Sequence, residues 1–372
     1  MNTKKDIYKE SLKFLRRLLL YSKIEDVIDD SVKIATKLLN AQRATLFIYD
    51  YNRNILYSKI GTGLKNQTIE LTLDRGIAGW VAKNKKLVNI KNVYKDERFL
   101  TSTDKKLHFK TKNMLCVPLL SIKNEILGVL QILNKKKGHF LKREEKIAQV
   151  LGETLSSILE NFNLHQENER MLKSTIKALS SAIDARDPVT KGHSERVSKL
   201  AVAIGRELGY SEQRLRLLEY AALLHDIGKL GIRDNILLKP GILTYEEFAV
   251  MKSHAEITRS ILEQIYFPPH LNNIPYIASS HHEKLDGSGY PKGLKSNQIP
   301  EEAKIIAVCD IFDALISHDR PYKKAMSIDQ ARTILEQQKG IFLDPKIVSL
   351  LFNKELYKEV LENPAQQKET TA

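Results

Sequence analysis

Residues 221–229 read Ala-Ala-Leu-Leu-His-Asp-Ile-Gly-Lys, a short apolar run that ends in a His-Asp pair and continues into Gly-Lys. The apolar part has the period of a helix. Because neighbouring side chains on a helix point about 100° apart, His225 and Asp226 cannot share one packed face. They can instead flank a point beyond the helix end, as ligands of two different metal ions would. Taken alone, a His-Asp pair is more often a surface or capping feature.

Further potential metal ligands recur through the second half of the chain, one or two for each predicted helix, as in a metal site inside a helix bundle. The set is larger than one mononuclear site takes, so it predicts two ions with Asp226 bridging them. Imidazole and carboxylate ligands without thiolate favour iron or manganese over a structural zinc ion. Each residue alone is more often a core histidine or a buried carboxylate, so only their joint occurrence indicates a metal site. The set is His193, His225, Asp226, His254, His281, His282 and Asp310.

Residues 281–291 read His-His-Glu-Lys-Leu-Asp-Gly-Ser-Gly-Tyr-Pro. With the His-Asp pair and the other ligands, this stretch resembles the HD-GYP family, a branch of the HD-domain metal-dependent phosphohydrolases, over roughly residues 179–352. The resemblance implies a centre of two or three divalent ions, commonly iron, with manganese as the alternative. It also implies hydrolysis of the bacterial second messenger cyclic di-GMP to pGpG, and onward to GMP.

Asp184 stands where many members of that family carry a glutamate that is associated with a third metal. The resemblance therefore makes Asp184 a further predicted metal ligand, although aspartate is one methylene shorter than glutamate. Asp187 competes for the same role.

Candidate phosphate-binding and base-binding residues flank the predicted metal cluster. Lys229 follows the His-Asp pair and can neutralise a phosphate oxygen, as the matched lysine does in the family. Arg320 and Lys323 offer a guanidinium and an ammonium for the second phosphate or a guanine edge, or they belong to an ordinary exposed basic loop. The predicted substrate-binding residues are Lys229, Tyr290, Asp313, Arg320 and Lys323, and the predicted catalytic residues are Asp226 and Lys229.

The first part of the chain has a different period, with short β-rich runs separated by Asn, Gly and Asp. This pattern predicts an α+β domain with an antiparallel sheet. Residues 75–81, 117–119 and 126–130 are similar to the corresponding pieces of a GAF domain, a small-molecule or redox sensor. The resemblance implies an unidentified small-molecule ligand, with a pure dimerisation scaffold as the alternative. The predicted strands are 44–49, 55–60, 68–73, 87–90, 114–120 and 126–133, and the predicted helices lie within 5–40 and at 76–82.

Apolar residues from Leu151 to Ile183 alternate in steps of four and three, interrupted only by the polar His165 and Glu169. This heptad pattern predicts a dimeric coiled coil, and the alternative is one amphipathic helix packed on its own chain. The predicted domains are a GAF-like sensor at 1–140, a signalling helix at 141–183 and an all-α HD-type bundle at 184–372. Helices are predicted in that bundle at 194–208, 212–224, 245–262, 303–317 and 328–337.

The chain carries a net charge of +14, which favours polyanionic partners. It has no helix-turn-helix signature and no basic stripe with interleaved aromatics, so nucleic acid is not a predicted partner. It also has no apolar run of about 20 residues that would span a membrane. The N-terminus lacks the apolar core of a signal peptide, which predicts a cytoplasmic protein. Cys116 and Cys309 are predicted core thiols.

The features together predict a cyclic di-GMP phosphodiesterase regulated by its GAF domain. One alternative is a metal-bearing receptor that binds cyclic di-GMP, turns it over slowly and signals through protein partners. Another is a hydrolase of a different nucleotide, such as a hybrid cyclic dinucleotide or a guanosine polyphosphate. The Gly-Tyr-Pro loop and the Arg320/Lys323 pair favour a cyclic dinucleotide without fixing its bases.

Overall fold

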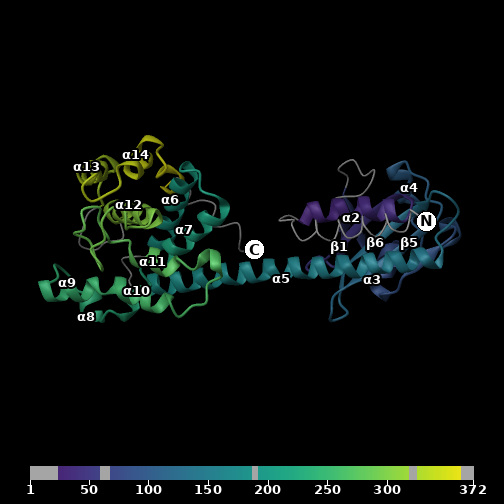
Figure 1. Ribbon diagram of the computed structural model, residues 1–372, viewed down its shortest axis with the longest axis horizontal. Helices are drawn as coiled ribbons and strands as arrows, with labels where there is room; N and C mark the ends of the chain where they lie inside the picture. Colours follow the sequence, from purple (N-terminus) through teal and green to yellow (C-terminus); the bar gives the residue numbers. More distant parts are fainter. Residues whose placement is uncertain (1–23, 59–67, 187–191, 318–324, 362–372) are drawn as a thin grey trace. The chain divides into compact units, whose positions relative to one another are not determined.

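The computed structural model describes residues 24–58, 68–186, 192–317 and 325–361. The chain divides into an N-terminal unit, which ends at Glu169, and a C-terminal unit, which begins at Arg170. The division falls inside one long helix, α5 (Lys142–Arg186), drawn in teal in Figure 1. Among the described residues, none of the helices has the combination of length and apolar character that crossing a bilayer requires.

The N-terminal unit is built on one six-stranded sheet in the order β3-β2-β1-β6-β5-β4, and every neighbouring pair is antiparallel. The α+β class and the strand positions predicted from the sequence are confirmed, except that residues 59 and 60 of the predicted strand 55–60 lie outside the described residues. The first of the two helices predicted within residues 5–40 lies outside the described residues. The strands are β1 (Ala41–Asp50), β2 (Ile55–Ser58), β3 (Ile69–Thr72), β4 (Val88–Ile90), β5 (Met114–Leu120) and β6 (Ile126–Lys135).

Both faces of this sheet are covered because its central strands are apolar on both sides. Leu46 packs in one core with α2 (Ile24–Leu38) and the first part of α5, whereas the next residue, Phe47, packs in a second core with α3 (Gly76–Asn84). Successive side chains of a strand point to opposite faces, so β1 contributes to both cores. Two short helices, η1 (Val93–Lys95) and α4 (Thr101–Leu107), lie in the connection between β4 and β5.

The heptad face of α5 is buried at both of its ends. Leu155 belongs to a core of the N-terminal unit, and Ile176 and Ile183 belong to the core of the C-terminal unit. Between them His165 is exposed and Glu169 is half-buried, and their side chains form a 3.6 Å pair. Much of the heptad pattern is thus explained by packing within each unit, as the single-chain alternative requires. The pairing of α5 with a second copy stays a prediction.

The C-terminal unit is a helix bundle, as predicted, with one hydrophobic core that also buries Cys309. The single helix predicted over 245–262 is wrong, because the chain breaks between α9 and α10. His254 Nδ1 donates to the Met251 carbonyl at 2.7 Å and Ser253 Oγ to the Val250 carbonyl at 2.6 Å, and such side-chain bonds compete with the helical ladder. The helices are α6 (His193–Glu207), α7 (Glu212–Leu224), η3 (Ile227–Gly231), α8 (Asp234–Leu237), α9 (Tyr245–Lys252), α10 (His254–Leu262), η4 (Pro269–Leu271), α11 (Ile274–Ser279), α12 (Glu301–Ile316), α13 (Ile328–Gln338), α14 (Pro345–Asn353) and α15 (Lys358–Leu361).

Candidate metal centre

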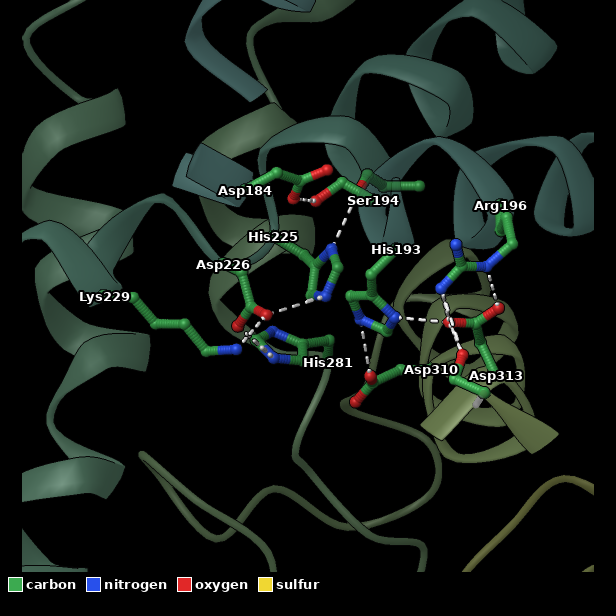
Figure 2. Close-up of polar contacts among 12 residues, drawn as sticks. Asp184, His193, Ser194, Arg196, His225, Asp226, Lys229, His281, Asp310 and Asp313 are labelled. Atoms are coloured by element: carbon green, nitrogen blue, oxygen red, sulfur yellow. Dashed lines mark hydrogen bonds and ion pairs between the residues drawn. The ribbon is translucent and has the colours of Figure 1, made fainter. Parts of the chain in front are cut away.

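The seven residues that the sequence predicted as the core of a metal site come together inside the C-terminal unit. Figure 2 shows His193, His225, Asp226, His281 and Asp310 from this set. The seven residues form overlapping groups of three in which the potential ligand atoms all lie within 4.8 Å of one another. Because two residues belong to two groups each, the groups are neighbouring parts of one cluster. The groups are His193, His225 and Asp310; His225, Asp226 and His281; and His254, His281 and His282.

The end of α7 explains how two consecutive residues serve the same cluster. His225 caps α7 in helical conformation, whereas Asp226 has φ −99° and ψ 7° and starts the tighter η3 helix. This change of helix type turns both side chains inward. Gly228, in η3, donates its amide proton to Thr258 Oγ1 of α10 at 2.9 Å, and Thr258 Oγ1 donates to the His225 carbonyl at 3.0 Å.

Three histidines each present an unprotonated ring nitrogen to the centre of the cluster. The Nδ1 atoms of His225, His254 and His281 donate to backbone carbonyls at 2.6, 2.7 and 2.6 Å, so each Nδ1 carries the proton. Their Nε2 atoms are buried and have no hydrogen-bond partner among the described residues. Buried polar atoms normally have a partner, and a metal-ligating histidine normally donates its other ring proton in this way. The orphaned nitrogens therefore fit a metal ion.

Burial also keeps histidines of the cluster neutral, which is the form that ligates metals. Removal from water lowers the pKa of His254 and lowers that of His281 strongly. Burial lowers the pKa of His282 to about 3.

Asp226 lies among these rings as a buried carboxylate. Its Oδ2 lies 3.4 Å from His225 Nε2 and 2.6 Å from Lys229 Nζ, and its Oδ1 lies 3.5 Å from His254 Nε2. Burial by itself would raise the pKa of Asp226, but the charge of the adjacent Lys229 ammonium holds it well below its usual range. Asp226 is therefore ionised and within reach of more than one ligand group, as a bridging role requires.

His193 is held between two carboxylates from α12. Its Nε2 lies 3.1 Å from Asp310 Oδ1 and its Nδ1 lies 2.7 Å from Asp313 Oδ2. Burial opposes protonation of this ring, but the two carboxylates raise its pKa to about 9. In the absence of a metal, His193 is consequently a cation at neutral pH.

Asp313, which the sequence predicted as a substrate-binding residue, is engaged in the structure by partners from its own chain. Its carboxylate also accepts from Arg196 Nε at 2.7 Å, Arg196 Nη2 at 3.0 Å and Ser317 Oγ at 3.1 Å. With both oxygens engaged and the side chain 5% exposed, Asp313 instead orients His193. The partner Arg196 was missed because nothing in its own position marks it as part of the site.

We expect Asp313→Asn to lower metal affinity about 10–100-fold, the usual cost of losing an outer partner of a ligating histidine. The amide is neutral and would no longer fix the proton on His193 Nδ1. The measurement is metal affinity by competition with a chelator, with Ser317→Ala as the matched control, since that change removes only one bond to the same carboxylate. Unchanged affinity in Asp313→Asn would contradict this role.

Metal uptake at pH 7 should release about one proton per chain from His193, because ligands must be deprotonated and its pKa is about 9 without metal. Affinity should accordingly rise as the pH increases toward 9. Calorimetric titrations in two buffers of different ionisation enthalpy count the protons. Asp313→Asn removes one of the two carboxylates that raise the pKa of His193, so this variant should release fewer protons on metal uptake than the natural chain. Equal proton release by the variant and the natural chain would refute the explanation.

Asp184 lies beside the ligand groups and belongs to none of them. Its carboxylate accepts from the Gly192 amide at 2.8 Å and from Ser194 Oγ at 3.2 Å, and burial raises its pKa. Figure 2 shows the bond between Asp184 and Ser194 on the far side of His225 from Asp310. Its role as a metal ligand stays a prediction, and Asp187, Arg320 and Lys323 lie outside the described residues.

The Gly-Tyr-Pro loop places Tyr290 against the cluster. The Tyr290 ring lies 4.7 Å from the His282 ring, tilted by 34°. Glu283, which sequence reasoning missed, holds this loop: its buried carboxylate accepts from the Lys292 amide at 2.7 Å and the Leu294 amide at 2.8 Å. Only its position next to the histidine pair could have drawn attention to it.

Comparison with known proteins agrees with this geometry. Residues 177–347 match the HD domain family and residues 23–159 match the GAF domain family. The chain is 42% identical over 212 residues to the cyclic di-GMP phosphodiesterase response regulator RpfG of Xanthomonas campestris, which covers 56% of this chain and 54% of that protein. It is 37% identical over 239 residues to a cyclic di-GMP phosphodiesterase of Thermotoga maritima, covering 64% of this chain and 62% of that protein.

A third relative is the 3'3'-cGAMP-specific phosphodiesterase 3 of Vibrio cholerae, at 41% identity over 184 residues, covering 50% of this chain and 39% of that protein. The chain thus spans less than two thirds of the length of each of these relatives. The family matches follow the division of the structure into a sheet unit and a helical unit. Along the chain, the match to the GAF domain family is thus followed by the match to the HD domain family.

Proposed function

We propose that this chain is a metal-dependent phosphodiesterase that hydrolyses cyclic di-GMP to pGpG and then to GMP under the control of its GAF domain. The observation that carries the proposal is the buried group of free histidine nitrogens around the ionised Asp226, with Lys229 beside it. The names of the relatives from Xanthomonas and Thermotoga support the substrate.

The cluster suits two divalent ions, of iron or manganese, because it offers nitrogen and oxygen ligands and no thiolate. One ion would be held through the group that contains His193 and the other through the group that contains His254, with Asp226 serving both. A third ion, through Asp184, is part of the proposal as an alternative. When bound, such ions lower the pKa of water and stabilise charge on phosphoryl oxygens.

The chain's own residues have separate tasks in this proposal. The Lys229 ammonium reaches into the cluster and would neutralise a non-bridging phosphate oxygen while staying close to Asp226. Tyr290 closes one side of the site and would contact the substrate through its ring or hydroxyl. Arg320 and Lys323 would bind the second phosphate or a guanine edge.

The test is metal content together with product chromatography. The protein is purified without oxygen and incubated with cyclic di-GMP, alongside a His225→Ala/Asp226→Ala control. The proposal expects two or more metals per chain and formation of pGpG or GMP, both lost in the control. Tight binding without product, with either iron or manganese, would replace it with the receptor function.

A second candidate substrate is the hybrid 3'3'-cyclic GMP-AMP, because a relative named for that substrate is 41% identical over half of this chain. A comparison of kcat/KM for the two cyclic dinucleotides separates them. Preference for the hybrid would revise the base specificity while keeping the reaction.

Regulation is proposed to begin in the GAF domain. A cavity of about 60 Å³ there is lined by apolar side chains and by polar ones that include Asp104, Gln131 and Arg43. The Arg43 guanidinium stacks on Phe109 at 3.9 Å. We propose this cavity as the site of a small-molecule ligand, and the middle of α5 as the contact of a homodimer. The molar mass in solution, measured by light scattering, tests for the homodimer. The mass of a single chain would contradict it. The cytoplasmic location stays a prediction.

A further inference from the structure

We infer that the last turn of α5 positions the catalytic cluster, with Arg186 acting on the substrate through Lys229. This inference rests on the proposed phosphodiesterase function. The α5 clamp, defined as Asp184 and Arg186, contacts the backbone on both sides of the site. One side carries His193 and the other carries Asp226 and Lys229.

Arg186 holds the carbonyl end of η3. Its guanidinium donates to the carbonyl of Lys229 at 3.3 Å, to that of Leu230, and to that of Ile232 at 2.6 Å. A fourth bond runs to Asp234 Oδ1 at 2.9 Å. The last carbonyls of a helix lack internal donors, and the rigid fork of five N–H groups on arginine suits several acceptors at once. Arg186 therefore fixes the segment from which the Lys229 side chain extends.

Asp184, half a turn earlier, holds the opposite side. It accepts from the amide of Gly192, the residue that caps α6, and from Ser194 Oγ in the first turn of that helix. His193 lies between these two contacts. The clamp thus joins α5 to the segments on either side of the cluster, which are more than thirty residues apart in sequence.

The base of the clamp is itself fixed. Ile183 is 2% exposed and Ile176 is also 2% exposed, and both pack in the core of the C-terminal unit. Arg186 is the last residue of α5, a helix of 45 residues that begins at Lys142. A change in the register of this helix would consequently move Arg186. Through its hydrogen bonds, Arg186 would then move the backbone segment that carries Lys229.

A double-mutant cycle tests whether Arg186 acts through Lys229 or only stabilises the fold. Arg186→Gln and Arg186→Lys are each made in the natural chain and in a Lys229→Ala background. The readout is kcat and KM for bis(p-nitrophenyl) phosphate and, separately, for cyclic di-GMP, with metal content measured for every variant. Asp234→Asn is the matched control, because Asp234 is 70% exposed and its loss leaves the carbonyl contacts in place. Arg206→Gln, on the exposed end of α6, controls for loss of an arginine.

We expect Arg186→Gln to lower kcat/KM about 10–100-fold, the order that a small misplacement costs, with bound metal unchanged. Arg186→Lys should lose nearly as much, because one ammonium cannot replace the fork. In the Lys229→Ala background the same changes should lower kcat/KM by less than about twofold, which is within the error to which independent mutations usually add. Both control variants should stay within about twofold of the natural chain.

Equal losses in the two backgrounds, or no loss in Arg186→Gln, would overturn the inference. Hydrolysis of bis(p-nitrophenyl) phosphate without hydrolysis of cyclic di-GMP would refute only the proposed substrate, and the cycle on the ester would still decide the role of Arg186. A metal-loaded protein that hydrolyses neither compound would refute the proposed function and the positioning role together.

Discussion

Replacing Asp226 with asparagine is expected to remove both metal binding and phosphodiester hydrolysis. The Asp226 carboxylate lies within 3.5 Å of His225 Nε2 and His254 Nε2, and it pairs with Lys229 at 2.6 Å. Asparagine keeps the shape but supplies no charge to offset two divalent ions, and it leaves the Lys229 ammonium beside neutral rings. Losing a residue that only orients a metal ligand typically lowers activity about 10–100-fold. We expect the rate of hydrolysis to fall by more than this in Asp226→Asn.

Metal analysis and product chromatography on the same preparation measure both effects. The matched control is Asp329→Asn, an exposed aspartate in the first turn of α13, which should retain full metal content. Thermal unfolding without metal shows whether the variant is folded. A folded Asp226→Asn protein that keeps two metals and its activity would show that Asp226 is not the shared ligand.

Among glycine-to-alanine substitutions near the site, Gly228→Ala is expected to lower the free energy of unfolding the most. A Cβ at Gly228 would lie 1.9 Å from the His254 carbonyl oxygen, 2.5 Å from the Thr258 amide nitrogen and 2.7 Å from Thr258 Oγ1. Two of these atoms belong to the backbone, so η3 and α10 would have to separate. Overpacking typically costs about 1–3 kcal/mol, and we expect at least the upper end here. Activity should fall too, because the separation moves Asp226 away from His254.

Gly231→Ala is the matched control in the same η3 helix. A Cβ at Gly231 would meet only side-chain carbons of Ile257, the nearest at 2.9 Å, and that side chain can rotate. Urea unfolding of the two metal-free variants compares their free energies of unfolding. Equal stability of the two proteins would show that the close approach of η3 to α10 does not constrain the fold.

The sequence alone predicted the cluster of histidines and aspartates in the C-terminal unit and the strands of the N-terminal unit. Both are encoded in local patterns: period-two alternation for strands such as β1 and β6, and helical repeats that place a histidine or aspartate where one helix ends or the next begins. The same patterns could not locate the break at Ser253, because it depends on side chains that take the carbonyls of Val250 and Met251.

The heptad pattern of α5 illustrates what periodicity leaves open. Apolar residues at these spacings predict a buried face but not the surface that buries it. In the structure, Leu155 lies in a core of its own unit, as do Ile176 and Ile183 at the other end. A partner chain and a core within the same chain give the same sequence signal, so only the packing distinguishes them.

What only the tertiary structure decided is the role of each polar group around the ligands. Asp313, three residues after Asp310, orients His193 through a contact 120 residues away in sequence, and Arg186 reaches carbonyls 43 to 46 residues away. Spacing along a helix records which residues share a face, whereas the partner of a buried carboxylate or guanidinium depends on which distant helices pack together. For this protein the sequence therefore determined the types of ligand and the elements that carry them. The folded chain determined the ring proton positions, the place of Asp226 among the histidines and the contacts of the α5 clamp, because those depend on distances between segments that the sequence does not specify.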